Sequence, residues 1–253
     1  MSIDLAVIGG TGLYRFPDLE DVERHRIDTP YGEPSDDAVV GTLGGKRVAF
    51  LARHGEGHSV APHRVNYRAN IWALHRLGAR RILGVNAVGG IREDMGPRVL
   101  VVPDQIIDYT SGRLTSFSDA EGAEVVHIDF SEPYTAAFRT ELIAAAAAAG
   151  VAVVDGGCYG ATQGPRLETR AEIARLRHDG CDLVGMTGMP EAALARELDC
   201  EYACLSLVAN WAAGCGDEAE ISLPEIFANL EAATAEVPKV VAAMLAAPQR
   251  QSV

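Results

Sequence analysis

Short apolar runs alternate along this chain with segments of helical periodicity, and most of the runs stop at glycines. Strands joined through helices need crossover connections, so this alternation predicts an α/β fold around a largely parallel or mixed sheet. The predicted strands are 3–8, 46–52, 81–87, 99–107, 151–162, 181–186 and 202–209. The predicted helices are 65–77, 135–149, 167–177, 190–198 and most of 223–245, with a break or bend at Pro238.

No linker, repeat or low-complexity tract interrupts this pattern over the 253 residues. The sequence therefore predicts a single domain spanning 1–253, with a central mixed β-sheet flanked by helices. A chain of this length can bury a substantial core. The least patterned region, about 110–125, is rich in Ser, Gly and Asp and is predicted to be a surface loop.

The formal net charge of −13 limits the partners of the chain. It argues against a nucleic-acid backbone or an anionic membrane surface, and it requires a local basic pocket for any anionic substrate. The five cysteines form no C-x-x-C pair, and an odd count is typical of a reduced, intracellular protein. No apolar run is long enough to span a bilayer, and residues 1–8 do not resemble a secretory signal, so the predicted location is the cytoplasm.

Residues suited to binding an anion follow three of the predicted strands. Gly9-Gly10-Thr11-Gly12 offers backbone N–H groups and a hydroxyl, Arg53 and His54 offer N–H donors, and Thr187 precedes a helix. Each has an ordinary alternative: turn glycines, a solvated basic loop and a helix N-cap. Convergence of all three on one phosphate is a hypothesis at this point. The glycines do not complete G-x-G-x-x-G, which argues against a dinucleotide cofactor.

Histidines cluster at His54, His58 and His63, which raises the question of a metal site. Their spacing matches no standard zinc signature, and no Cys or Glu framework surrounds them, so no metal is predicted. His127 is isolated in sequence and by itself fits a loop histidine.

A carboxylate and a carboxamide, Glu168 and Asn210, follow predicted strands at positions where α/β enzymes commonly build ligand sites. The carboxylate can accept a hydrogen bond from a ligand N–H, and the carboxamide can both donate and accept. If both face one pocket, they select a ring that shows an N–H and a carbonyl. Taken singly, Glu168 fits a surface helix charge and Asn210 fits a turn or strand cap.

Five segments, in family order from residue 8 to about 230, resemble the trimeric purine nucleoside phosphorylase and methylthioadenosine phosphorylase family. They are Gly9-Gly10-Thr11-Gly12-Leu13, LARHGEGH (51–58), VNYRANIWAL (65–74), QGPRLETRAE (163–172) and GMTGMPEAALARE (185–197). The resemblance implies one α/β domain with a central mixed sheet, and phosphorolysis of the N-glycosidic bond of a nucleoside. It also implies inorganic phosphate as co-substrate with no further cofactor, and a homotrimer or a dimer of trimers.

The resemblance assigns roles to individual residues. Those implied to hold phosphate are Thr11, Arg53, His54 and Thr187, with the Asn86-Ala87 backbone. Met186 would lie against the ribose, Leu167 would also contact the nucleoside, and His127 would come from the neighbouring subunit. Asn86 departs from the Thr of methylthioadenosine phosphorylases, which leaves the role of its side chain open.

Two further positions bear on the substrate. Members acting on 6-oxopurines carry Glu and Asn at the positions of Glu168 and Asn210, whereas methylthioadenosine phosphorylases carry Ser and Asp. The 6-oxopurine N1–H suits a carboxylate, whereas N1 of adenine is an acceptor and opposes it. Where phosphorylases of ordinary ribosides place a His against the 5′-hydroxyl, this chain has Leu223, with Phe227 a turn later, which suits a 5′-methylthio group.

This combination implies S-methyl-5′-thioinosine as substrate, and the closest resemblance within the family is to bacterial members that act on it. The leaving purine would be stabilised by Asn210 and Glu168. Open alternatives are a methylthioadenosine phosphorylase with unusual base contacts and an inosine or guanosine phosphorylase. A nucleotide-binding reductase and a non-catalytic purine sensor are alternatives of a different class.

Overall fold

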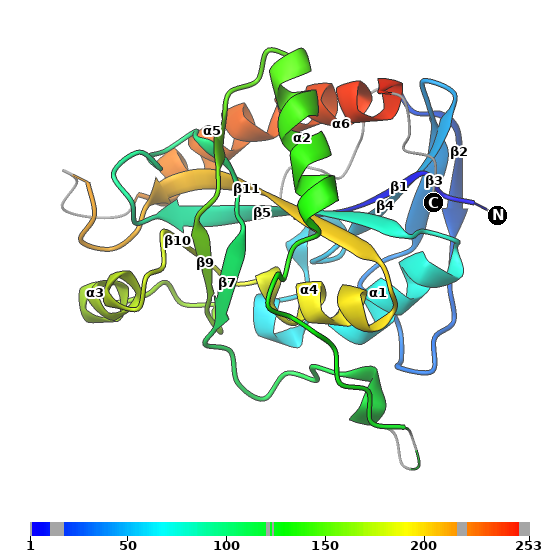
Figure 1. Ribbon diagram of the computed structural model, residues 1–253, viewed down its shortest axis with the longest axis horizontal. Helices are drawn as coiled ribbons and strands as arrows, with labels where there is room; N and C mark the ends of the chain where they lie inside the picture. Colours follow the sequence, from blue (N-terminus) through cyan, green and yellow to red (C-terminus); the bar gives the residue numbers. More distant parts are fainter. Residues whose placement is uncertain (1, 11–17, 120–121, 123, 217–221, 248–253) are drawn as a thin grey trace.

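The structure, a computed structural model, describes residues 2–10, 18–119, 122, 124–216 and 222–247. Its eleven described strands form one mixed sheet with helices on both faces (Figure 1), so the predicted α/β fold is confirmed. The strands are β1 (Leu5–Gly9), β2 (Glu20–His25), β3 (Ala38–Leu43), β4 (Lys46–Ala52), β5 (Arg81–Gly90), β6 (Leu100–Val102), β7 (Gln105–Asp108), β8 (Val153–Asp155), β9 (Cys158–Ala161), β10 (Leu183–Gly185) and β11 (Glu201–Trp211). The α-helices are α1 (Tyr67–Arg76), α2 (Ala136–Ala148), α3 (Arg170–His178), α4 (Gly188–Glu197), α5 (Leu223–Thr234) and α6 (Val237–Ala246).

The two faces of the sheet are covered by different helices (Figure 1). Side chains of β1 alternate between two cores, because successive residues of a strand point to opposite faces. Ala6 and Ile8 pack in the core that includes residues of α1 and α4. Leu5 and Val7 pack in the core that includes residues of α2, α5 and α6. The short apolar run read from the sequence is therefore a strand buried on both sides, as parallel strands of α/β proteins usually are.

Strand β5 lies at the centre of the sheet and has a break along one edge. On that edge, its residues 82–84 pair with β1 in parallel, and its last two residues, Gly89 and Gly90, pair with β10 in antiparallel fashion. No described strand pairs with 85–88 on this side, whereas β11 pairs with β5 along the whole of the other edge. The break exposes backbone groups of β5 in the middle of the molecule, and these need other partners.

Strand β11 carries an irregularity next to a predicted site residue. Its pairing with β5 shifts register between Val208 and Asn210. An extra residue in one strand bends it and re-aims the side chains that follow, and such bulges are common beside active sites. The bulge brings Asn210 opposite Gly89, at the same end of β5 as the break described above.

Several predicted boundaries are wrong. The single strand at 99–107 is two strands, β6 and β7, because Pro103 and Asp104 separate a stretch that pairs with β11 and β8 from one that pairs with β9. The strand at 151–162 also splits, at two glycines of positive φ, Gly156 and Gly157. The helix from 167 starts at Arg170 instead, behind a capping box formed by Thr169 and Glu172.

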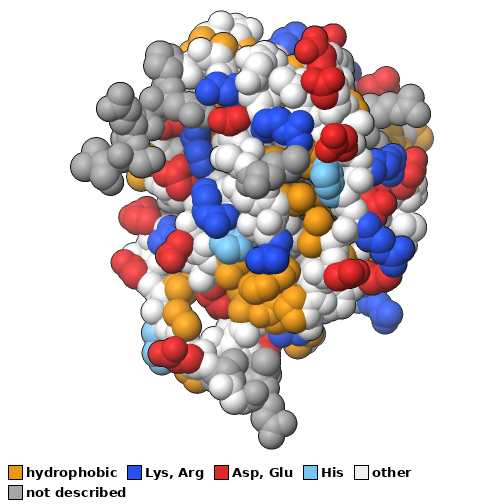
Figure 2. Space-filling view, turned by 90° about the vertical axis from the view of Figure 1, so that its right-hand side faces the viewer, with side chains coloured by type: hydrophobic (Ala, Val, Ile, Leu, Met, Phe, Trp, Pro, Cys, Tyr) orange, Lys and Arg blue, Asp and Glu red, His pale blue; other side chains and the backbone are white. Residues whose placement is uncertain are grey.

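Strands β2 and β3 are absent from the sequence prediction. β2 is an exposed edge strand of mostly charged residues, so it has no apolar alternation to detect. The break at Pro238 is confirmed, since this residue lies in the first turn of α6. No described helix has the length and apolar character needed to cross a membrane. On the face shown in Figure 2, acidic and basic side chains are interspersed, and apolar side chains gather in one patch low on the view.

Candidate active site

Most of the predicted site residues line one cavity of about 270 Å³ at the break beside β5. They are Arg53, His54, Asn86, Ala87, Leu167, Glu168, Met186, Thr187 and Asn210. Sequence positions far apart meet here for a topological reason. β4 and β11 run parallel to β1 and β5, respectively, so the carboxyl ends of these strands lie at one edge. β10 runs against β5, which brings Met186 and Thr187 back past Ala87 and Asn86.

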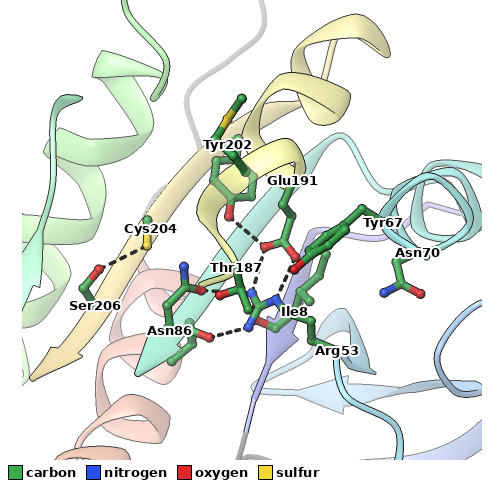
Figure 3. Close-up of polar contacts among 12 residues, drawn as sticks. Ile8, Arg53, Tyr67, Asn70, Asn86, Thr187, Glu191, Tyr202, Cys204 and Ser206 are labelled. Atoms are coloured by element: carbon green, nitrogen blue, oxygen red, sulfur yellow. Dashed lines mark hydrogen bonds and ion pairs between the residues drawn. The ribbon is translucent and has the colours of Figure 1, made fainter. Parts of the chain in front are cut away.

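Arg53, which follows β4, is 1% exposed and is held by Glu191 of α4, which is 0% exposed (Figure 3). Its Nε donates to Glu191 Oε2 at 2.8 Å, and its Nη2 donates to Glu191 Oε1 at 2.7 Å. The Tyr202 hydroxyl donates to the same Oε1 at 2.8 Å. Burial lowers the pKa of Arg53, but the charge and hydrogen bonds of Glu191 outweigh it, and the net pKa is raised. The Arg53 guanidinium is therefore permanently charged.

The other donors of Arg53 bind the neighbouring strands. Nη1 donates to Val85 O at 2.8 Å, and Nη2 donates to Ile8 O at 3.1 Å and to Asn86 Oδ1 at 3.0 Å. One Nη1 proton then has no acceptor among the described residues. Most of the Arg53 fork therefore closes the break in the sheet, while the residue also lines the cavity.

Glu191 and Tyr202 were not among the predicted site residues. Glu191 reads as an ordinary helix charge, yet it lies in a buried helical segment with Ala192, Leu194 and Ala195. A charge among apolar residues needs a buried partner of opposite sign, and this is the signal that could have identified it. A partner position, however, is invisible without the fold.

Asn86 and Thr187 both present polar side chains at the same cavity. Asn86 is 1% exposed, and its Nδ2 has no hydrogen-bond partner among the described residues. Thr187 is the N-cap residue of α4, but its hydroxyl makes no capping hydrogen bond to the helix. Val85 directs its carbonyl into the break, and strand groups alternate between edges, so the Ala87 backbone N–H also faces the break. These donors, at the N-terminus of α4, form an anion-binding arrangement.

His54 lies against this group as a neutral ring. Its Nδ1 is 2.8 Å from Val60 O, so that nitrogen carries the proton and donates. Burial, and then the charge of Arg53, lower the pKa of His54 to about 4. At neutral pH, Nε2 is therefore a hydrogen-bond acceptor. An anion bound nearby would favour protonation of the ring, since it supplies the opposite charge.

Glu168 and Asn210 line the same cavity, which meets the condition set from the sequence. Glu168 Oε1 accepts a hydrogen bond from Thr162 Oγ1 at 2.6 Å. Asn210 Nδ2 donates to Trp211 O at 2.6 Å, which leaves one N–H and the Oδ1 acceptor for a ligand. Around them the cavity is apolar: its lining includes Val184, Leu207, Ala209, Ile226 and Leu230. A flat ring with polar edges fits such a site.

Three predicted residues do not line the cavity of the single chain. Leu223 and Phe227 of α5 are 61% and 58% exposed, and His127 lies on the exposed segment 124–127. Ile226 and Leu230 form the α5 side of the cavity instead. They lie at helical spacing from Leu223, and that spacing could have identified them. Thr11 lies outside the described residues. Among the described residues, no group of three or more potential ligands could hold a metal ion.

Glu191→Gln is expected to lower the free energy of unfolding by about 3 kcal/mol, because it leaves the buried Arg53 charge without a counter-ion. Urea unfolding measures this. Glu231→Gln, on an exposed position of α5, is the matched control and should cost less than about 0.5 kcal/mol. Equal effects of the two changes would contradict a central role for the buried pair.

His54 is expected to make the protein less stable as the pH falls. Its pKa is about 4 in the fold against an ordinary value of 6.5, so between these values only the unfolded chain takes up the proton. The contribution of neutral His54 to the free energy of unfolding is complete above pH 6.5 and is lost as the pH falls towards 4. Between pH 7 and 5, His54→Gln should remove about 2 kcal/mol of the pH dependence of unfolding. An unchanged dependence would show that His54 is not neutral in the fold.

Comparison with known proteins agrees with this geometry. The family model described as "Phosphorylase superfamily" matches residues 4–246. A relative from Xanthomonas campestris pv. campestris, named probable S-methyl-5′-thioinosine phosphorylase, is 63% identical over 95% of this chain and 96% of its own length. The 6-oxopurine nucleoside phosphorylase of Pyrococcus furiosus is 48% identical over 83% of this chain and 80% of its own length.

Solved structures give the same result. The crystal structure of a methylthioadenosine phosphorylase from an antarctic soil metagenomic library superimposes with a TM-score of 0.90 at 40% identity, covering 97% of this chain and 86% of that one. A methylthioadenosine phosphorylase from Schistosoma mansoni in complex with adenine gives a TM-score of 0.91 at 31% identity, covering 97% and 91%. The chain therefore belongs to the phosphorylase superfamily.

Proposed function

We propose that this protein is a pentosyltransferase that cleaves S-methyl-5′-thioinosine with inorganic phosphate. The products are hypoxanthine and 5-methylthioribose 1-phosphate, a step of purine salvage. The observation that carries the proposal is the meeting of Glu168 and Asn210 in the cavity that also holds the anion-binding arrangement. Four relatives named probable S-methyl-5′-thioinosine phosphorylase, 54% to 63% identical, support the same activity.

The base end selects a 6-oxopurine by matching donors to acceptors. Glu168 accepts from the N1–H of the base, and Asn210 donates its remaining N–H to O6 and accepts from N7–H. Adenine presents an acceptor at N1 and a donor at the 6-position, so both contacts would be mismatched. Unpaired buried polar groups discriminate strongly, which makes this pair a sufficient basis for base choice.

At the phosphate end, the Thr187 hydroxyl, the Asn86 side chain, the Ala87 N–H and the N-terminus of α4 bind the dianion, with Arg53 and His54 beside them. Thr11 is proposed to complete this site. The reaction has no covalent enzyme intermediate and uses no cofactor. As the glycosidic bond loosens, the phosphate stabilises the positive charge on the ribose, against which Met186 lies, and then attacks C1′. Asn210 stabilises the charge that flows into the leaving purine.

We also propose a cytoplasmic homotrimer, or a dimer of trimers. The exposed apolar side chains of Leu114, Val125, Val126, Leu223 and Phe227 support an assembly that covers them. In such an assembly, the side chain of His127 from a neighbouring subunit would contact the substrate, while Leu167, Leu223 and Phe227 would enclose it. The five cysteines are free thiols, which fits a reducing compartment.

A methylthioadenosine phosphorylase is the second candidate. Solved structures of that activity superimpose closely on this chain, and the apolar residues Ile226 and Leu230 suit a 5′-methylthio group with either base. An inosine or guanosine phosphorylase keeps the same base contacts but needs a polar partner for the 5′-hydroxyl. The two candidates differ from the proposal at opposite ends of the substrate, so one set of substrates separates them.

Phosphate-dependent base release should be measured with methylthioinosine, methylthioadenosine, inosine and guanosine. We expect kcat/KM for methylthioinosine to exceed that for methylthioadenosine by about 100-fold or more, because the adenine compound leaves both polar contacts unmatched. We expect it to exceed that for inosine by about 10-fold or more, because an apolar wall cannot bind the 5′-hydroxyl. Omitting phosphate should abolish release. A preference for methylthioadenosine or inosine would replace the proposal with the corresponding candidate.

Asn210→Ala is expected to lower kcat by about 100- to 1,000-fold, because it removes stabilisation of the leaving purine in the transition state. The KM for phosphate should change little, since the anion site is at the other end of the cavity. The matched variant Asn210→Asp keeps the acceptor for N7–H but loses the donor to O6, so its preference should move towards methylthioadenosine. Unchanged turnover in Asn210→Ala would refute the leaving-group role.

A further inference from the structure

Glu168 lies between two cavities, and its carboxylate accepts a hydrogen bond from the hydroxyl of Thr162, which lines the second cavity. Glu168 lines the candidate active site and also a second cavity of about 260 Å³, which Thr162 lines as well. Resting on the function proposed above, we propose that Thr162 is a specificity-determining residue. It acts as a positioning residue: it occupies one carboxylate oxygen of Glu168, so that the other can only accept a hydrogen bond from the base.

The backbone of Thr162 is fixed on both sides. Thr162 follows β9 directly, and its N–H donates to Gly185 O at 2.8 Å, just before Met186. Its carbonyl accepts from Arg113 Nη2 at 3.2 Å. The next residue, Gln163, accepts from the same guanidinium through its own carbonyl at 3.0 Å and through Oε1 at 3.3 Å. The hydroxyl of Thr162 therefore leaves a rigid point of the fold.

Arg113 also connects this point to the phosphate end of the cavity. Its Nη1 donates to Met189 O at 2.5 Å, at the start of α4, and to the Tyr67 hydroxyl at 3.2 Å. This arginine comes from the region 110–125, which the sequence predicts to be a surface loop only. The loop thus bonds the segment at Thr162 to the start of α4.

The Thr162 hydroxyl has one proton and two acceptors in reach. Glu168 Oε1 is at 2.6 Å and Gly185 O is at 3.3 Å. The nearer, charged acceptor forms the stronger bond, so the proton lies on the Glu168 side. No described residue donates to Glu168 Oε2. With Oε1 occupied by the Thr162 hydroxyl, Oε2 is left to accept a hydrogen bond from the ring, which suits N1–H of a 6-oxopurine.

Thr162→Val removes the hydroxyl and keeps the shape of the side chain, and Thr162→Ser keeps the hydroxyl. We expect Thr162→Val to lower kcat/KM for methylthioinosine by about 10- to 100-fold, the effect of losing a hydrogen bond to a charged group. The kcat/KM for methylthioadenosine should change by less than about threefold, because that base makes no use of the accepting carboxylate. The KM for phosphate should not change, and Thr162→Ser should restore the wild-type ratio of the two substrates.

If Thr162 had a structural role alone, Thr162→Val would lower kcat/KM for both substrates equally. An equal loss, or an unchanged ratio of the two kcat/KM values, would overturn the inference. A double-mutant cycle with Glu168→Gln gives a second test. If Thr162 acts through Glu168, then Thr162→Val should have little further effect in the Glu168→Gln protein, whereas additive effects would overturn the inference. The substrate preference of the wild-type protein separates failure of the proposed function from failure of this inference. A wild-type preference for methylthioadenosine overturns both. A preference for methylthioinosine that Thr162→Val leaves intact overturns the inference alone.

Discussion

The buried ion pair of Arg53 and Glu191 joins the elements around the break in the sheet. Through Arg53 the end of β4 is bonded to β1 at Ile8 O, to β5 at Val85 O and to α4 at Glu191 (Figure 3). A buried pair is strongly destabilising when one partner is missing, so each of these elements must keep its place for the charge to be satisfied. The pair and its partner Tyr202 also leave no room for a side chain at Gly84. A Cβ there would come within 2.2 Å of the Tyr202 hydroxyl and 3.1 Å of Glu191 Oε1.

The same pair determines how the cavity can bind an anion. Arg53 is already neutralised by Glu191, and the chain as a whole carries a net charge of −13. Attraction for an anion must therefore come from oriented N–H and O–H groups near α4 more than from free charge. The Asn86 side-chain N–H group, which has no partner among the described residues, and the Thr187 hydroxyl, which makes no capping bond to α4, are groups of this kind. Such fixed dipoles need no reorganisation during the reaction, which is what transition-state stabilisation requires.

Residue types at the ends of strands were visible in the sequence, but their partners were not. Glu168 and Asn210 stand out because each carries a distinctive hydrogen-bonding group after an apolar run, and both line the cavity. Glu191 looks like any helix charge until the fold shows that it is fully buried. Leu223 was expected at the 5′ end of the substrate, but its side chain is exposed in the single chain, and Ile226 lines the cavity in its place.

The sequence by itself determined the class of fold and which polar residues follow the strands, because apolar periodicity and polar residues at strand ends are local properties. It could not determine that 99–107 changes partners at Pro103, or that β2 pairs at the edge, because strand pairing depends on contacts between distant segments. Only the tertiary structure decided that Arg53 forms an ion pair with Glu191 and that Arg113 donates a hydrogen bond to the Thr162 carbonyl. Hydrogen bonds of this kind join residues many positions apart, and a donor's type does not reveal which acceptor it will meet.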